Sequence, residues 1–165
     1  MEEIIILDKF LAAEFRPRRR TVLIRIFSTD TFLALSYPRI KYFKHFEKVF
    51  CYRFDDVTPK DIEDELRAGG NPEWVLFSEE DASKIITDFE RVYRNTDCLV
   101  VHCKAGGSRA PALAGALNHS FNLGIKDENY LNRSYCNPNM HVYSTFVRTA
   151  REKFGMNFRA LWLGG

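Results

Sequence analysis

The chain has 165 residues, 45% of them hydrophobic and 14% aromatic, and a formal net charge of +2. This length suits one domain with a hydrophobic core, and the near-neutral charge gives no strong case for a nucleic-acid partner. The four cysteines lack metal-ligand spacing, so we expect no metal and reduced thiols, as in a cytoplasmic protein. The apolar run at residues 4–7 is too short for a secretory signal or a membrane span.

The first third of the chain alternates apolar runs with polar turns. Apolar and β-branched residues predict strands at residues 3–7, 21–27 and 49–54, with one or two helical turns at 8–15. Residues 16–20, Arg-Pro-Arg-Arg-Arg, are interpreted as a solvated basic loop. The alternative is a rim whose positive field attracts acidic or phosphorylated substrates.

Aromatic side chains are frequent between residues 37 and 46. We interpret Tyr42, Phe43 and Phe46 as core residues, although an aromatic ring near a cleft could also stack on a substrate ring. The segment contains Tyr37-Pro38, which is expected to interrupt regular structure.

A capping box and a double glycine bound a predicted helix in the middle of the chain. Thr58 and Asp61 are spaced to cap its start, and glycines 69 and 70 end it. We expect Trp74 and Phe77 to pin the loop that follows to the core. This segment is a candidate lid over a site.

The second half of the chain reads as further helices around one strand. Ser78 is expected to cap a helix with an apolar stripe. A short helix is predicted at residues 127–135 and a long amphipathic helix at 140–154, with Asn139 as a cap rather than a catalyst. The alternation predicts an α/β fold with a central, mostly parallel sheet flanked by helices. We expect one domain over residues 1–165, with 155–165 as a tail.

Residues 97–121 carry the strongest functional signal. A buried strand at 99–101 leads into a loop with two glycines, and helical spacing begins near Arg109. In such a strand, loop and helix, the loop N–H groups and the first helical turn point at one spot, where negative charge is favoured.

Cys103 and Arg109 lie at the two ends of this loop. A cysteine beside N–H donors, a helix start and a guanidinium is in surroundings that favour the nucleophilic thiolate. The planar fork of Arg109 can hold two oxygens of a phosphate. These residues predict a cysteine that attacks a bound phosphoryl group.

The loop reads His102-Cys103-Lys104-Ala105-Gly106-Gly107-Ser108-Arg109. It resembles the signature of the cysteine-dependent protein tyrosine phosphatases, most closely the small dual-specificity branch. The resemblance implies the cysteine phosphatase fold, a phosphocysteine intermediate and no cofactor. It also implies that Cys103 is the nucleophile, that residues 104–109 form the phosphate-binding loop (P-loop), and that His102 supports the loop without a catalytic role.

The same resemblance implies a carboxylic acid on the loop after the preceding strand, which protonates the leaving oxygen. Asp56 and Asp55 both fit this place in the sequence. We prefer Asp56 because its sequence context is similar to that of small relatives, and Asp55 is the alternative. By the rule for parallel sheets, the site should lie at the carboxyl ends of the strands.

The resemblance implies hydrolysis of phosphate monoesters on phosphorylated proteins or peptides: phosphotyrosine, with phosphoserine and phosphothreonine as further substrates. Ala110 stands where the family usually has a Ser or Thr that assists release of the thiolate. A phosphate-binding pseudophosphatase or a very slow phosphatase is therefore the alternative. Phosphoinositide or RNA 5′-phosphate hydrolysis and a sulfurtransferase of the rhodanese kind rank below these. The oligomeric state is left open.

Overall fold

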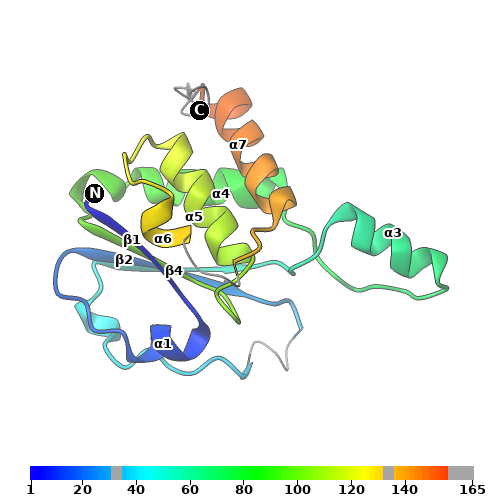
Figure 1. Ribbon diagram of the computed structural model, residues 1–165, viewed down its shortest axis with the longest axis horizontal. Coiled ribbons are helices and arrows are strands. Elements are labelled where there is room, and N and C mark those ends of the chain that lie inside the picture. Colours follow the sequence, from blue (N-terminus) through cyan, green and yellow to red (C-terminus); the bar gives the residue numbers. More distant parts are fainter. Residues whose placement is uncertain (31–34, 132–135, 156–165) are drawn as a thin grey trace.

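The computed structural model describes residues 1–30, 35–131 and 136–155. Its centre is a sheet of parallel strands in the order β1-β4-β2-β3 (Figure 1). The strands are β1 (Glu3–Leu7), β2 (Thr21–Phe27), β3 (Lys48–Arg53) and β4 (Cys98–His102). The predicted strands are confirmed, although β3 begins and ends one residue earlier than expected.

Successive side chains of the two central strands, β2 and β4, point to opposite faces of the sheet and divide the core into two layers. On β2, Val22 and Ile24 face the larger hydrophobic cluster, whereas Leu23 faces the smaller one. On β4, Leu99 belongs to the larger cluster and Val100 to the smaller. Successive strand side chains point to opposite faces, so a strand that is apolar at every position must be covered on both sides.

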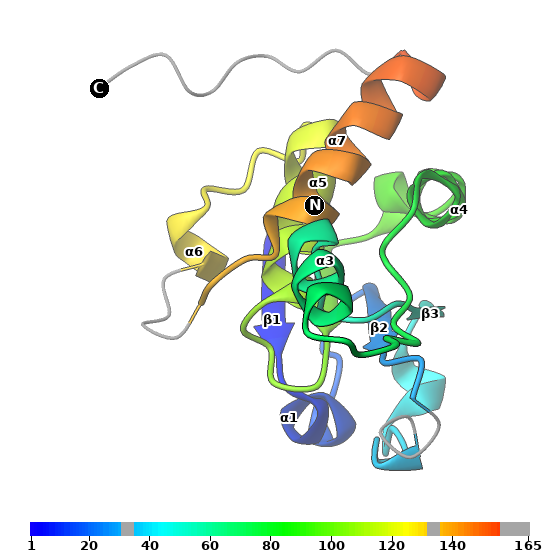
Figure 2. The same cartoon turned by 90° about the vertical axis from the view of Figure 1, so that its right-hand side faces the viewer.

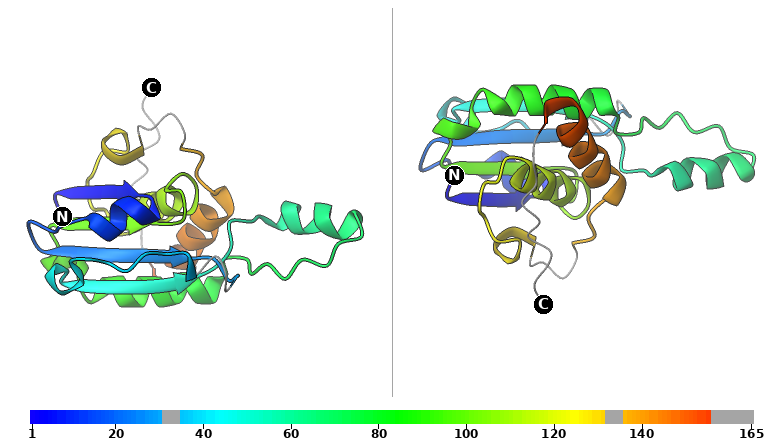
Figure 3. Two further views of the ribbon diagram at one scale, coloured as in Figure 1. Left: turned by 90° about the horizontal axis from the view of Figure 1, so that it is seen from below. Right: turned by 90° about the horizontal axis from the view of Figure 1, so that it is seen from above.

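Helices cover both faces of the sheet. The helix α1 (Lys9–Glu14) lies on one face with the 3-10 turn η1 (Phe43–His45). The opposite face carries α4 (Glu79–Glu90), α5 (Arg109–Ser120), α6 (Glu128–Leu131) and α7 (Met140–Phe154), as Figure 3 shows. The turn η2 (Tyr93–Asn95) leads into β4. This arrangement confirms the predicted α/β fold.

The predicted caps are present at the helix starts. Ser78 and Asp81 form a capping box on α4, and the Asn139 side chain accepts hydrogen bonds from the N–H groups of His141 and Val142 at the start of α7. The predictions for residues 132–135 and 156–165 lie outside the described residues.

The segment of residues 56–76, here called the arm, projects from the body of the molecule in Figure 1 and points toward the viewer in Figure 2. It contains α3 (Pro59–Arg67), which begins with the predicted capping box and has no buried residue. The arm is closed at its base, where the N–H of Asp55 donates to the Val75 carbonyl at 2.9 Å. Because α3 extends outward, the helix does not form the lid considered from the sequence.

Two expectations about aromatic side chains were wrong. Trp74 is 43% exposed and does not pin the arm to the core, whereas Phe77 is buried against Phe54 with ring centroids 4.7 Å apart. Phe43 is 57% exposed, whereas Phe46 is buried as expected. Phe43 lies on the short turn η1, where a polar surface position and a core position cannot be told apart by periodicity.

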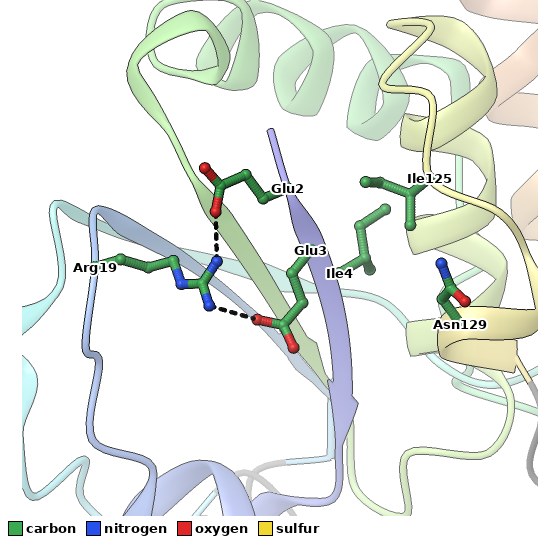
Figure 4. Close-up of a pocket in the computed structure, with 6 residues that line it drawn as sticks. All are labelled: Glu2, Glu3, Ile4, Arg19, Ile125 and Asn129. Carbon is green, nitrogen blue, oxygen red and sulfur yellow. Dashed lines mark hydrogen bonds and ion pairs between the residues drawn. The ribbon is translucent and has the colours of Figure 1, made fainter.

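The basic residues 16–20 precede β2 and so lie at the amino end of the parallel strands. Figure 4 shows Arg19 between Glu2 and Glu3, at 2.6 and 3.7 Å from their carboxylates. Arg20 forms an ion pair with Asp97 at 2.7 Å. The signature loop follows the opposite end of β4, so this basic loop does not form a rim around it. Within the described part of the chain, no helix is both long and apolar enough to cross a membrane.

Candidate active site

The predicted site residues meet in one cleft of about 550 Å³ at the carboxyl ends of β3 and β4. Its lining comprises residues of the signature loop, of the segments after β2 and β3 and of the chain before α7: Ser28, Asp55, Asp56, Val57, Trp74, Cys103, Lys104, Ala105, Gly107, Ser108, Arg109 and Asn137. Segments some 50 residues apart in the sequence therefore converge, because parallel strands end at the same edge of the sheet.

The loop from Cys103 to Arg109 is held tightly against the end of β1. Gly106 has a positive φ of 73°, and a Cβ at this position would lie 2.9 Å from the carbonyl carbon and oxygen of Leu7. Only glycine fits this backbone at this distance. The thiol-bearing Cys103 is 2% exposed at the floor of the cleft.

The loop carbonyls are turned outward to neighbouring backbone. The carbonyl of Lys104 accepts from Lys9 N–H at 3.3 Å, and that of Gly107 accepts from Asn137 N–H at 2.8 Å. In the part of the chain that the structure describes, no backbone bond has an N–H of residues 104–108 as its donor. The loop thus offers donors to an anion in the cleft.

Arg109 is 3% exposed and is anchored from one side of its guanidinium. Its Nη1 donates to the carbonyl of Phe54 at 2.7 Å and to that of Phe27 at 3.3 Å. Its buried Nε has no hydrogen-bond partner among the described residues and lies 4.0 Å from Asp56 Oδ2. A buried guanidinium with an unused donor beside a cleft is suited to hold an anion.

The carboxylate of Asp56 faces the cleft, and its side chain is 40% exposed. Its Oδ1 accepts from Ser108 Oγ at 2.7 Å and from Asn139 Nδ2 at 3.0 Å. These contacts join the arm, the signature loop and the start of α7, and they hold one oxygen while the other faces Arg109.

Asp55 also borders the cleft, but its carboxylate is bound by Thr29 and Val75 instead of facing Arg109. The residue as a whole is 7% exposed, and its carboxylate accepts from the N–H groups of Thr29 and Val75, each at 3.0 Å, and from the Thr29 hydroxyl. Burial alone would raise its pKa, but these hydrogen bonds outweigh burial and lower it. A carboxylate that is held charged by three donors acts as a clamp at the base of the arm.

His102 lies behind the loop and is fully buried. Its Nε2 accepts from Arg25 Nε at 3.1 Å, and its ring lies 5.9 Å from that of Tyr37. Burial, and then the charge of Arg25, lower the pKa of His102 to about 4, so the imidazole is neutral at pH 7.

Sequence reasoning missed three contributors to this region. Arg25 is paired with His102 in the β2–β4 register, and Asn139 contacts Asp56 in addition to capping α7. Trp74 lines the cleft. A charged residue within an otherwise apolar strand was the available signal for Arg25, but nothing local distinguishes the other two.

No family model matches the chain, and no curated protein was found to match it. Among solved structures, PTPMT1 in complex with PI(5)P is similar, with a TM-score of 0.51 and 14% identity over 93% of each chain. A second structure of PTPMT1 has a TM-score of 0.50 and 16% identity, covering 93% of this chain and 92% of that one. Human tyrosine phosphatase-like serine/threonine/tyrosine-interacting protein has a TM-score of 0.51 and 15% identity, covering 94% and 97%.

The chain has the fold of the cysteine-dependent tyrosine and dual-specificity phosphatases. The likeness spans nearly the whole length of this chain and of each similar chain, and the fold implied by the signature is thereby confirmed. At identities of 14–16% the likeness concerns the fold, so the chemistry must be argued from this chain's own residues.

Proposed function

We propose that this chain is a phosphatase that hydrolyses phosphate monoesters through a phosphocysteine intermediate. The observation that carries this proposal is the convergence of Cys103, Arg109 and Asp56 on one cleft. Each supplies a chemically different part of the reaction: a nucleophile, an anion holder and a proton donor.

In the first step, the thiolate of Cys103 attacks phosphorus and forms a sulfur–phosphorus bond. The bond between phosphorus and the ester oxygen breaks, and the protonated carboxyl of Asp56 gives its proton to that oxygen. The leaving group departs as a neutral alcohol or phenol, and Asp56 is left as a carboxylate.

In the second step, water attacks the phosphocysteine. The carboxylate of Asp56 takes a proton from this water, the sulfur–phosphorus bond breaks, and Cys103 leaves as the thiolate. Inorganic phosphate is released, and the enzyme returns to its starting state with Asp56 protonated.

Charge on the phosphoryl oxygens is met by Arg109 and by the N–H groups of residues 104–108, none of which donates to a backbone carbonyl in the described part of the chain. Arg109 Nη1 is occupied by two backbone carbonyls, which fixes the plane of the guanidinium, while its Nε has no hydrogen-bond partner among the described residues. Donors that are already oriented need no reorganisation when the transition state forms.

The test is hydrolysis of p-nitrophenyl phosphate across pH by the wild type and by two variants. Cys103→Ser should abolish turnover, and Asp56→Asn should lower kcat by about 100-fold, the usual scale for loss of a general acid. Asp64→Asn, on the exposed face of α3, is the matched control and should leave kcat unchanged. Retained turnover in Cys103→Ser would contradict the proposal.

The second candidate is a phosphate-binding protein with little or no turnover. It is favoured by Ala110, which is fully buried in the first turn of α5 and offers no hydroxyl to the leaving thiolate. Binding of vanadate without hydrolysis of any ester would support this candidate over the first.

Phosphorylated proteins or peptides are the proposed substrates. A similar solved structure contains PI(5)P, and the exposed Lys104 at the cleft keeps phosphoinositides as a lesser alternative. RNA 5′-phosphates are a further one. Comparing the kcat/KM values of a phosphopeptide, a phosphoinositide and a 5′-phosphorylated oligonucleotide separates the three.

A further inference from the structure

Trp74 is a large apolar side chain that the arm leaves 43% exposed at the edge of the cleft. Other exposed hydrophobic residues of the described chain, such as Leu66 and Phe43, lie outside the cleft lining. Tryptophan is among the residues most enriched where proteins make energetically important contacts, because it covers a large area and has few rotatable bonds. An indole held half-exposed in a cleft is thus a candidate for contact with a ligand.

The backbone next to this indole is anchored by the residue that follows it. The N–H and the carbonyl of Val75 are both bonded to Asp55, at 3.0 Å to its carboxylate and 2.9 Å to its N–H. Asp56 is the next residue on the other side of this clamp. The clamp therefore ties the two ends of the arm together, and Trp74 and Asp56, one near each end, both line the cleft.

The chemistry of the proposed function then places the leaving group. Asp56 must reach the ester oxygen to give it a proton, so the group attached to that oxygen lies on the arm side of the cleft. The apolar side chains that the arm adds to the cleft lining are Val57 and Trp74. An aromatic leaving group could pack on the indole, whereas the shorter side chain of serine offers it no ring.

We propose that Trp74 is a specificity-determining residue that packs on the ring of phosphotyrosine and favours aromatic over aliphatic phosphate esters. This inference rests on the proposed function of the same site. It assigns to Trp74 the substrate contact that the sequence left open for the aromatic residues 42, 43 and 46, none of which lines the cleft.

A ring contact of this kind is present both in the bound substrate and in the transition state. Such uniform binding changes KM and leaves kcat nearly constant. Trp74→Ala should therefore raise KM for a phosphotyrosine peptide by about 3- to 10-fold, the scale of an aromatic pair. The kinetic constants for a phosphoserine peptide of the same sequence should stay unchanged.

Three variants are compared on these two peptides. Trp74→Phe keeps a ring and should retain most of the preference, while Trp74→Ala should lose it. Leu66→Ala removes another exposed apolar side chain, 55% exposed, from the arm outside the cleft, and is the matched control. An unchanged ratio of kcat/KM for the two peptides in Trp74→Ala, with hydrolysis intact, would overturn the inference and leave the proposed function standing.

A binding measurement keeps the inference testable if the wild type hydrolyses nothing. The chain has two tryptophans, so Trp162→Phe leaves Trp74 as the single emitter. In a Cys103→Ser background, phosphotyrosine should change its emission, whereas inorganic phosphate and phosphoserine should not. Absence of hydrolysis together with this change would refute turnover but support Trp74. No change with phosphotyrosine would overturn the inference about Trp74.

Discussion

Asp55 and Asp56 are adjacent in the chain, but their carboxylates face in different directions. Asp55 is 7% exposed and clamps Thr29 and Val75, whereas the 40% exposed Asp56 side chain faces Ser108 and Arg109 across the cleft. The sequence left both as candidates for the proton donor. Their surroundings favour Asp56 for chemistry and Asp55 for structure.

The two roles predict opposite consequences of the same substitution. Asp55→Asn should lower the free energy of unfolding by about 2 kcal/mol, because one of the N–H donors that it holds would lose its acceptor. Asp56→Asn should leave the free energy of unfolding within about 0.5 kcal/mol of the wild type while kcat falls. Urea unfolding and steady-state kinetics on both variants check this. A stability loss confined to Asp56→Asn would contradict the assignment.

Burial of His102 beside Arg25 predicts a pH dependence of stability. Its pKa is lowered from 6.5 to about 4 in the folded protein, so the unfolded chain binds the extra proton first. The contribution of neutral His102 to the free energy of unfolding is fully present above pH 6.5. It is lost as the pH falls from 6.5 towards 4, and the free energy of unfolding decreases by about 3 kcal/mol over this range.

This contribution is isolated by comparison with His102→Gln. Between pH 7 and pH 4, the wild type should lose about 3 kcal/mol more of its free energy of unfolding than this variant, since the variant has no imidazole to protonate. Urea unfolding at several pH values gives the dependence of the free energy of unfolding on pH for both proteins. The same pH dependence in both would show that His102 is protonated in the folded state at low pH.

Gly106 is predicted to tolerate no side chain. Gly106→Ala combines a strained positive φ with a Cβ at 2.9 Å from the Leu7 backbone, and should cost about 3 kcal/mol of stability as well as activity. Gly124 has a similar φ of 75° but nothing within 4 Å of its Cβ position, so Gly124→Ala should cost about 1 kcal/mol and leave activity intact. Equal stability losses in the two variants would mean that the loop yields to the added methyl group.

Ala110 is predicted to limit the second chemical step. Ala110→Ser restores the hydroxyl usual in the family and should raise the steady-state rate about 10-fold, since a hydrogen bond to a charged group is worth about 1.5 kcal/mol. Ala112→Ser, which adds the same hydroxyl two residues further along the buried part of α5, is the control. In rapid-mixing experiments, a product burst that shrinks in Ala110→Ser but not in Ala112→Ser would support a slow second step. Equal steady-state rates in the two variants would contradict it.

The sequence predicted what is encoded locally. The strand, loop and helix around Cys103 are contiguous in the chain, and their glycines and periodicity determine a short structure that needs little tertiary context. The strands and the caps at Ser78 and Asn139 were predicted for the same reason.

What could not be predicted depends on distant partners. The separate roles of Asp55 and Asp56 depend on Thr29, Val75 and Ser108, which lie 20 to 52 positions away. Trp74 was expected to pin the loop to the core, but it is 43% exposed and lines the cleft, which is formed by segments distant in the sequence. The basic residues 16–20 lie at the far end of the sheet because they precede a strand, whereas the signature loop follows one.

The central claim is that Cys103 becomes phosphorylated during turnover. The most direct measurement is mass spectrometry of protein quenched in acid shortly after mixing with p-nitrophenyl phosphate. We expect one added phosphoryl group, which fragment ions locate to Cys103 rather than Cys98 within the same peptide, and which is absent in Cys103→Ser. Product formation with an adduct on another residue, or with the same adduct in Cys103→Ser, would contradict the proposed chemistry.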